Sequence, residues 1–492
     1  MVGGRRRGIA PVFLGALLAS CALPSRPTLR EDDGEASSPM HEGGPDASLD
    51  VVDAGVERDA ADARDVSAPA PDGEAGAVDG PDDRSLDADS GAVPDAKPTD
   101  GSDAGDAGSD APFESASPDG TGPCVVSISA GMWHTCGLLR DGVHCWGHDG
   151  EGELGDGLDP SDSRPGVSPT PVLENVKAVS AGAMHSCALT TAGGVRCWGF
   201  NNAGQLGFAQ PDAAVPLLSP PSTDVLTNVK AIAAGYDFTC ALTVSGGVRC
   251  WGSNAYGQLG IGSSSITMLS TPPSADAITG VKAVAAGDWH TCVLTTAGGV
   301  RCWGQNTNGQ LGIGSLTPED VFAPPATDVL TGASAVAAGY AHTCAVMISG
   351  GVRCWGFNMY GQLGDGTTND RLAPPTTTTA LAGVPVASVG AGYAHTCALT
   401  AAGSVYCWGY NLVGQIAEDT SVVPQEVAPA LIPLGTQATA LTVGDSYSCA
   451  ITVGGSVLCW GTDNNGQFGD GAIAGTRFTP TLASSLEAVC RM

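Results

Sequence analysis

Residues 176–207 read VKAVSAGAMHSCALTTAGGVRCWGFNNAGQLG, and closely similar stretches occur seven times in this chain of 492 residues. Each copy holds a Cys, a short apolar stretch, a Gly-rich turn, a second Cys followed by Trp-Gly, and an ending close to Gly-Gln-Leu-Gly. The copies start 51–53 residues apart, and their first cysteines are Cys136, Cys187, Cys240, Cys292, Cys344, Cys397 and Cys449. A period of roughly 40–50 residues with several short strands per unit is typical of β-propellers. The sequence therefore predicts an all-β fold, a seven-bladed β-propeller over residues 123–492.

Three strands are predicted within residues 176–207. Residues 176–180 form the first, which Ala-Gly ends. Residues 185–190 and 194–198 form two further strands around a Thr-Ala-Gly turn, which is typical of a three-residue hairpin loop. About twenty Pro-rich residues follow in most copies, and they should hold the outermost strand and its loops, because Pro occurs in sheets chiefly at edges.

The hairpin places the two cysteines of a copy opposite one another, at a Cα separation that a disulfide can bridge. Zinc is the alternative for paired cysteines, but the spacing does not fit C-x-x-C knuckles and two further ligands are missing. Residues 486–490 resemble the first strand of a copy, and we expect them to form a strand at the same junction as residues 125–129. This would bring Cys490 to Cys124, so an eighth disulfide, Cys124–Cys490, is expected. Paired cysteines indicate an oxidising compartment. The pairs within copies are Cys136–Cys145, Cys187–Cys197, Cys240–Cys250, Cys292–Cys302, Cys344–Cys354, Cys397–Cys407 and Cys449–Cys459.

Residues 1–20 have the layout of a secretion signal. Three arginines at positions 5–7 precede an apolar run from Ile9 to Ala19, which is too short to span a bilayer as a helix. Leu18-Ala19-Ser20-Cys21 resembles the lipobox of bacterial lipoproteins, and the resemblance implies that Cys21 carries a lipid. An ordinary cleaved signal peptide with an incidental Cys is the alternative. The expected location is the cell envelope, lipid-anchored at the outer membrane or cell surface rather than free in the medium.

Residues 21–122 are predicted to be a disordered linker. Between residues 22 and 122 there are 26 Asp plus Glu against 6 Lys plus Arg, and Phe113 is the only Phe, Tyr or Trp. Such a segment cannot bury enough apolar surface to offset its chain entropy. The whole chain carries a formal net charge of −30, which argues against a nucleic-acid partner because phosphate binding needs a basic surface.

The repeat resembles a known family. Ala-Gly-x-x-His-[Ser/Thr]-x-Ala-Leu followed by Trp-Gly-x-Asn-x-x-Gly-Gln-Leu-Gly is similar to the repeat of the regulator of chromosome condensation family, whose fold is a seven-bladed propeller of four-stranded blades. The resemblance covers residues 123–492. Departures are local: Phe238 and Tyr447 stand in place of the His, Glu153 in place of the Gln, and Ile416-Ala417 in place of Leu-Gly. The paired cysteines are an addition to the family pattern.

Two sets of residues could suggest a metal, and neither is persuasive. One repeat position holds a His in five copies, His134, His185, His290, His342 and His395. In the other two copies Phe238 and Tyr447 keep an aromatic ring but lose the ligand nitrogen, which favours a packing role with one hydrogen bond. The Asp-Gly pairs at 156–157, 365–366 and 470–471 also suit tight turns, and no twelve-residue acidic loop of the calcium-binding type follows them. No residues form a recognisable catalytic setting, so we expect a protein that is not an enzyme, with no cofactor.

The two residues between Ala-Gly and the His position are the candidate binding residues. These turns join two strands, so all seven should emerge on one face of the ring near its axis. Aromatic residues with a few carboxylates are typical of an interaction surface, whereas packing along the central channel and a site in the Pro-rich loops are the alternatives. The candidates are Trp133, Tyr236, Asp237, Asp288, Trp289, Tyr340, Tyr393 and Asp445.

The expected function is binding by an exported, membrane-tethered propeller, with an unknown protein as the partner. By resemblance, secreted bacterial inhibitors of β-lactamases suggest inhibition of an extracytoplasmic enzyme. The alternative is a propeller that binds carbohydrate or cell wall as a glycan ligand. Exchange of guanine nucleotide on a small nuclear GTPase is a second alternative from family analogy only, and an exported chain would not meet that GTPase.

Overall fold

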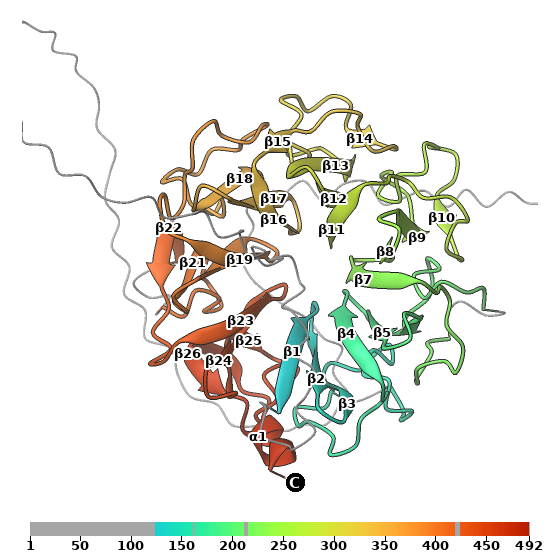
Figure 1. The fold of residues 1–492 in the computed structure, drawn as a ribbon. Coiled ribbons are helices and arrows are strands. Elements are labelled where there is room, and N and C mark those ends of the chain that lie inside the picture. The colour runs from blue at the N-terminus through green and yellow to red at the C-terminus, as the bar shows by residue number, and fades with distance from the viewer. Residues whose placement is uncertain (1–123, 161–162, 211–214, 419–423, 492) are drawn as a thin grey trace, which may run out of the picture. The chain divides into compact units, whose positions relative to one another are not determined.

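The computed structural model describes residues 124–160, 163–210, 215–418 and 424–491. The predicted signal peptide, Cys21 and the acidic linker lie outside the described residues. Seven small antiparallel sheets stand around a central axis, which confirms the all-β, seven-bladed propeller (Figure 1). No helix within the described part of the chain is long and apolar enough to cross a membrane.

Every blade contains three regular strands in chain order, and the first of them lies innermost (Figure 1). Blades 1 and 2 are β1 (Val125–Ala130), β2 (His134–Leu139), β3 (Gly142–Gly147), and β4 (Val176–Ala181), β5 (His185–Thr190), β6 (Val195–Gly199). Blades 3 and 4 begin with β7 (Val229–Ala234), β8 (Phe238–Thr243), β9 (Val248–Ser253), and β11 (Val281–Ala286), β12 (His290–Thr295), β13 (Gly299–Gln305). Blade 5 is β16 (Ala333–Ala338), β17 (His342–Met347), β18 (Val352–Gly356). Blades 6 and 7 begin with β19 (Val386–Ala391), β20 (His395–Thr400), β21 (Val405–Tyr410), and β23 (Ala438–Val443), β24 (Tyr447–Thr452), β25 (Val457–Asp463).

The outer edge of each blade comes from the Pro-rich stretch, as predicted, but it is regular in only four blades. In blades 1, 2 and 5 isolated bridges take the place of a fourth strand, as between Gly199 and Leu217. Pro is tolerated at such an edge, and the regular outer strands of blades 6 and 7 themselves contain one. The regular outer strands are β10 (Met268–Leu269), β14 (Asp320–Val321) with β15 (Leu330–Thr331), β22 (Gln425–Leu431) and β26 (Gly475–Leu482).

The cysteines of each repeat face one another in the register between the second and third strands, and all seven predicted pairs are disulfides. Cys187 lies opposite Cys197, and the Cα separations of the seven pairs are 4.0–4.1 Å. In the first blade the hairpin is one residue shorter, so Cys136 pairs with Cys145 at a spacing of nine.

Neighbouring blades are joined by the Trp of the Cys-Trp-Gly motif. Trp198 of blade 2 is fully buried in the core of blade 1 with Leu138 and Val143. Its indole N–H donates to the carbonyl oxygen of Glu153, the Gln position of the preceding repeat. The same bond occurs at all seven junctions, with lengths of 2.9–3.0 Å. The Trp side chains therefore fasten each blade to the one before it.

The ring closes between blades 7 and 1 through this same contact and through an additional staple. Trp146 packs with Phe468, and its N–H donates to the carbonyl oxygen of Gln467. Cys124 and Cys490 form the eighth disulfide, at a Cα separation of 5.6 Å. Each of these end blades is built from its own consecutive stretch of chain.

The prediction of a strand at residues 486–490 is wrong. These residues lie in the short helix α1 (Ser484–Cys490), whose Leu486 is buried in the core at the closing junction. β1 already fills the inner position of blade 1, and β26 fills the outer edge of blade 7. With both places taken, the last segment packs as a helix and still brings Cys490 to Cys124.

Candidate functional site

The Ala-Gly-x-x turns lie at one end of the channel, on the face that we call the turn face. In each blade the turn Gly N–H donates to the carbonyl oxygen of the residue at the His position, at 2.9 Å. In six blades the next backbone N–H donates across to the neighbouring turn, as from Ala183 to Gly235 at 3.4 Å. A Cβ on Gly182 would lie 2.6 Å from the Gly235 oxygen, so this close approach requires glycine.

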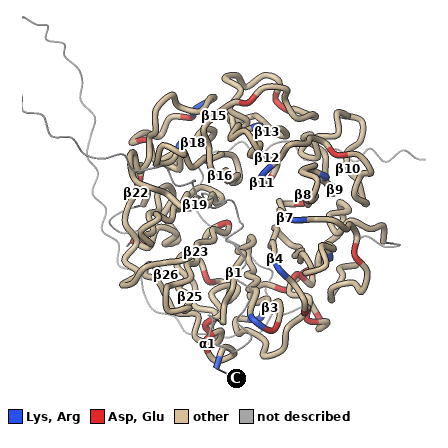
Figure 2. Tube along the Cα trace, viewed as in Figure 1, with Lys and Arg blue, Asp and Glu red and all other residues tan. Residues whose placement is uncertain are grey.

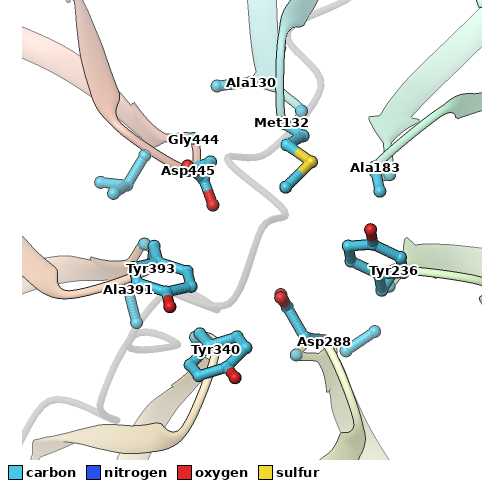
Figure 3. A pocket seen from close by; sticks show the side chains of 18 of the residues that line it. Ala130, Met132, Ala183, Tyr236, Asp288, Tyr340, Ala391, Tyr393, Gly444 and Asp445 are labelled. Carbon is cyan, nitrogen blue, oxygen red and sulfur yellow. The ribbon is translucent and has the colours of Figure 1, made fainter. Parts of the chain in front are cut away.

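The first gap residue of each turn lines a cavity of about 140 Å³ at the mouth of the channel. We call these seven the mouth residues: Met132, Ala183, Tyr236, Asp288, Tyr340, Tyr393 and Asp445. Figure 3 shows the carboxyls of Asp288 and Asp445 and the side chain of Met132 pointing into the opening, with the three tyrosine rings around it. Five of the eight predicted binding residues therefore meet at this mouth.

The other three predicted residues, at the second gap position, lie outside the cavity lining. Trp289 packs on the ring of Tyr236, with 4.7 Å between centroids. Trp133 packs instead against His148, at 5.3 Å. The Asp237 carboxylate accepts a hydrogen bond from the Gln205 side chain at 3.3 Å. Of these three residues, Trp289 alone packs on a mouth residue.

The carboxyl groups at the mouth are hard to ionise. Burial, together with the nearby charges of Asp445 and Asp237, raises the pKa of Asp288 to about 7. Burial raises the pKa of Asp237 to about 6. Burial also raises the pKa of Asp445, whose carboxylate accepts a hydrogen bond from the Ser446 hydroxyl at 2.7 Å. None of the residues that line the cavity is Lys or Arg.

Lysines and carboxyl groups occupy opposite ends of the inner strands. Lys177, Lys230 and Lys282 are the second residues of the inner strands β4, β7 and β11, and Figure 2 shows the positive segments there. The turns follow four residues later in each strand, about 13 Å further along the axis. The lysines therefore lie toward the other face, which we call the hairpin face, and the carboxyls lie at the turn face.

Further aromatic residues extend the turn face outward over blades 3 to 6, and sequence reasoning missed them. Tyr256 meets Trp289 at 5.4 Å between centroids, and Tyr360 meets Tyr410 at 4.7 Å. Phe357 adjoins Tyr360, while Met359 and Leu412 are half exposed beside them. All follow the Trp-Gly end of a third strand, and the register places that end beside the turn, as in the pairing of His290 with Gly304. Their position within Trp-Gly-x-Asn-x-x-Gly was the signal in the sequence.

The five histidines hold adjacent blades together. His185 Nε2 lies 3.0 Å from the hydroxyl of Thr239 in the next blade, and that hydroxyl donates to the Gln205 carbonyl oxygen. Since a hydroxyl has one hydrogen, it accepts from His185, which is the neutral Nε2–H form. Burial lowers the pKa of His185 to about 3. The same arrangement supports a structural role for His134, His290, His342 and His395, all of them fully buried.

The departures from the repeat pattern keep these junctions intact in different ways. The Tyr447 hydroxyl donates to the carbonyl oxygen of His134 at 2.6 Å, across the closing junction. Phe238 keeps an aromatic ring at the His position and packs in a hydrophobic cluster instead of making a hydrogen bond. Glu153 accepts the N–H of Glu151 and also bonds the His148 ring.

The Asp-Gly turns hold arginines. Asp156, Asp365 and Asp470 form ion pairs with Arg164, Arg371 and Arg477 of the same loops. Within the described ranges, no group of three or more His, Cys, Asp or Glu side chains is placed to hold a metal ion. These carboxylates therefore stabilise their own loops through ion pairs.

The ring, its repeat and its junctions define a propeller of the regulator of chromosome condensation type. Residues 89–382 match the RCC1-like domain, and residues 386–415 and 438–467 match the regulator of chromosome condensation (RCC1) repeat. The chain belongs to the RCC1-like domain family. It is 33% identical over 374 residues to the ultraviolet-B receptor UVR8 of Arabidopsis thaliana, covering 74% of this chain and 82% of the receptor.

Two further similarities agree with this assignment. The secretion-regulating guanine nucleotide exchange factor of Bos taurus is 29% identical over 324 residues, covering 61% of this chain and 69% of that protein. The crystal structure of Prp20p from Saccharomyces cerevisiae has a TM-score of 0.60 and 23% identity, covering 69% of this chain and 85% of that one. The similarity to Prp20p shows a shared fold.

Replacing Asp288 with Asn is expected to raise the melting temperature at pH 8 by about 1–3 °C, the range for roughly 1 kcal/mol in a large domain. Because the folded-state pKa is raised to about 7, Asp288 favours folding when protonated and that contribution is lost as the pH rises from about 4 through 7. The groups that face Asp288 are Asp445, Asp237 and the mouth tyrosines.

Melting curves of the two proteins at pH 4 and pH 8 measure this difference. The curves should coincide at pH 4, where the carboxyl is protonated and resembles the amide. A difference that is the same at both pH values would show that the Asp288 carboxyl does not titrate as described.

Proposed function

We propose that this chain is an exported, membrane-tethered binding module whose propeller captures a partner protein through the turn face. The aromatic groups of this face carry the proposal. Trp289 with Tyr236 and Tyr256 form one partly exposed cluster, and Tyr360 with Tyr410 form another. Tyr and Trp at the centre of a surface are the residue types that dominate binding energy at protein interfaces.

Export is supported by the sequence of residues 1–21 and by the eight disulfides, because such bonds persist in oxidising compartments. Lipid attachment at Cys21 and the envelope location are part of the same proposal. A count of free thiols on protein recovered from cells tests the compartment. We expect none among the sixteen propeller cysteines, and substantial free thiol would contradict export.

The family leaves the partner open. Its members here include a photoreceptor and a nucleotide exchange factor by name, and a fold does not decide a function. For an exported chain, inhibition of an extracytoplasmic enzyme fits better than exchange of guanine nucleotide. Capture of a glycan is the second candidate, since exposed aromatic rings also stack on sugars. Capture from an envelope fraction whose proteins have first been denatured would identify a glycan as the target.

A double variant, Trp133→Ala with Trp289→Ala, is expected to weaken partner capture by a few kcal/mol, the cost typical of central aromatic residues. Its matched control is Ile348→Ser with Val453→Ser, which removes apolar side chains that are 72% and 62% exposed at the tips of the hairpin face. The measurement is capture from envelope fractions by the full-length chain, with melting curves of each protein.

Capture should fail in the first variant and persist in the control, with both proteins folded. Unchanged capture by the Trp variant, or a loss confined to the hairpin-face control, would place the site elsewhere. The Pro-rich loops are then the next surface to examine.

A further inference from the structure

We propose that the cavity at the mouth binds an alkylammonium group, such as the end of a lysine side chain that the partner protein inserts into the ring. This inference rests on the proposed function and names the chemistry of the group that the turn face receives. It combines an unpaired, partly buried carboxyl, three tyrosines and a cavity of matching size.

No positively charged side chain in the described part of the chain pairs with the Asp288 carboxyl. This carboxyl points into the opening (Figure 3) and makes no ion pair or hydrogen bond with the residues that the structure describes. Asp445 faces the same space, and the only hydrogen bond to its carboxyl from a described residue comes from Ser446. Two carboxyls that face one cavity repel each other, which contributes to the raised pKa of Asp288. A bound cation would remove that repulsion.

The tyrosines select an organic cation. Tyr236, Tyr340 and Tyr393 line the same cavity, and aromatic faces attract ammonium groups through their negative faces. Tyr340 and Tyr393 lie 4.4 Å apart between centroids, and Trp289 backs Tyr236, so neighbouring rings hold these three rings in place. A divalent metal would need about six oxygen ligands, which two carboxyls among tyrosine rings do not supply.

The size of the cavity limits the ligand to a side chain or a small amine. About 140 Å³ is close to the volume of a cavity that holds one benzene molecule. An ammonium with a few methylene groups fits that space, and a folded segment does not. The surrounding aromatic clusters of the turn face would then contact the surface that presents the lysine.

Titration of the full-length chain by ligand-observed NMR tests this inference with matched charged and neutral probes. The charged probes are n-butylammonium and the peptide Gly-Gly-Lys-Gly-Gly. The neutral ones are n-butanol and the same peptide with its lysine acetylated. We expect each charged probe to bind about tenfold or more tightly than its neutral partner, the size of a partly desolvated cation–π and charge interaction.

Three variants locate the binding. Asp288→Asn should weaken the charged probes about tenfold or more while raising the melting temperature at pH 8, a split that a misfolded protein would not give. Tyr236→Leu keeps an apolar lining and removes one aromatic face, so it should weaken them as well. Glu174→Gln removes an equal charge at an exposed position before β4, toward the hairpin face, and should leave binding unchanged.

Equal binding of charged and neutral probes, no binding of the lysine peptide, or binding indifferent to Asp288→Asn would each overturn the inference. The proposed function fails separately. A propeller that binds the lysine peptide but captures no envelope partner would retain the ammonium site and lose the proposed role. Partner capture that survives Asp288→Asn unchanged would retain the role and lose the inserted lysine.

Discussion

Removal of the Cys124–Cys490 disulfide, by Cys124→Ser with Cys490→Ser, is expected to lower the free energy of unfolding by about 6 kcal/mol on the chain-entropy estimate. The bond closes a loop across a sequence separation of 366 residues, and the chain entropy that a crosslink removes grows with the length of its loop. It also joins the two ends of the ring, where each end blade is built from its own stretch of chain. Chemical unfolding of both proteins measures the difference.

The matched control removes a disulfide of a single blade, Cys187→Ser with Cys197→Ser. That bond spans ten residues, so its loss should cost about 3 kcal/mol on the same chain-entropy estimate. If the end-to-end variant loses no more stability than this control, the packing between blades 1 and 7 closes the ring without the staple.

Trp303→Ala is expected to destabilise the propeller by about 3–5 kcal/mol, the usual cost of truncating a buried large aromatic residue. Trp303 of blade 4 is fully buried in the core of blade 3, where Phe238 and Leu259 pack in the same cluster. Its indole N–H donates to the Gln258 carbonyl oxygen at 3.0 Å. The variant therefore leaves a cavity at a blade junction and removes one of the bonds between blades.

Trp303→Phe separates these two effects. It keeps a ring and loses the N–H, while the Gln258 oxygen still accepts the Thr291 hydroxyl at 2.7 Å. We expect a smaller loss of about 1–3 kcal/mol, from one hydrogen bond and part of the packing volume. Ile348→Ala, at a side chain 72% exposed, should change stability very little. A loss below about 1 kcal/mol for Trp303→Ala would contradict the role given to the Trp junctions.

The parts of the fold that depend on local periodicity could be predicted from the sequence. The spacing of Cys187 and Cys197 fixes the register of a hairpin, and the structure has that register. The helix at residues 484–490 could not be predicted in this way, because a short apolar run fits either a strand or a helix. Its state depends on whether a sheet edge is free, and β26 occupies the edge of blade 7.

The candidate site was predictable in its place and less so in its details. The turn position brings Tyr236, Asp288 and Asp445 to one mouth, as expected from strand connectivity. The sequence pattern does not say which of the two gap residues points to the axis, and Trp133 and Trp289 turn away from the cavity. Tyr256 and Tyr360 were missed because their loops reach the turn face only through the pairing of the third strand with the second.

Site-specific photo-crosslinking in the producing cell tests most directly whether the turn face is the binding surface. A photoreactive residue is placed in the full-length chain at Met359 or Leu412 on the turn face, or at Ile348 or Val453 on the hairpin face, all of them half or more exposed. We expect a discrete adduct with one partner protein from the turn-face positions and none from the hairpin-face positions. Adducts only from the hairpin face, or from neither face, would contradict this expectation.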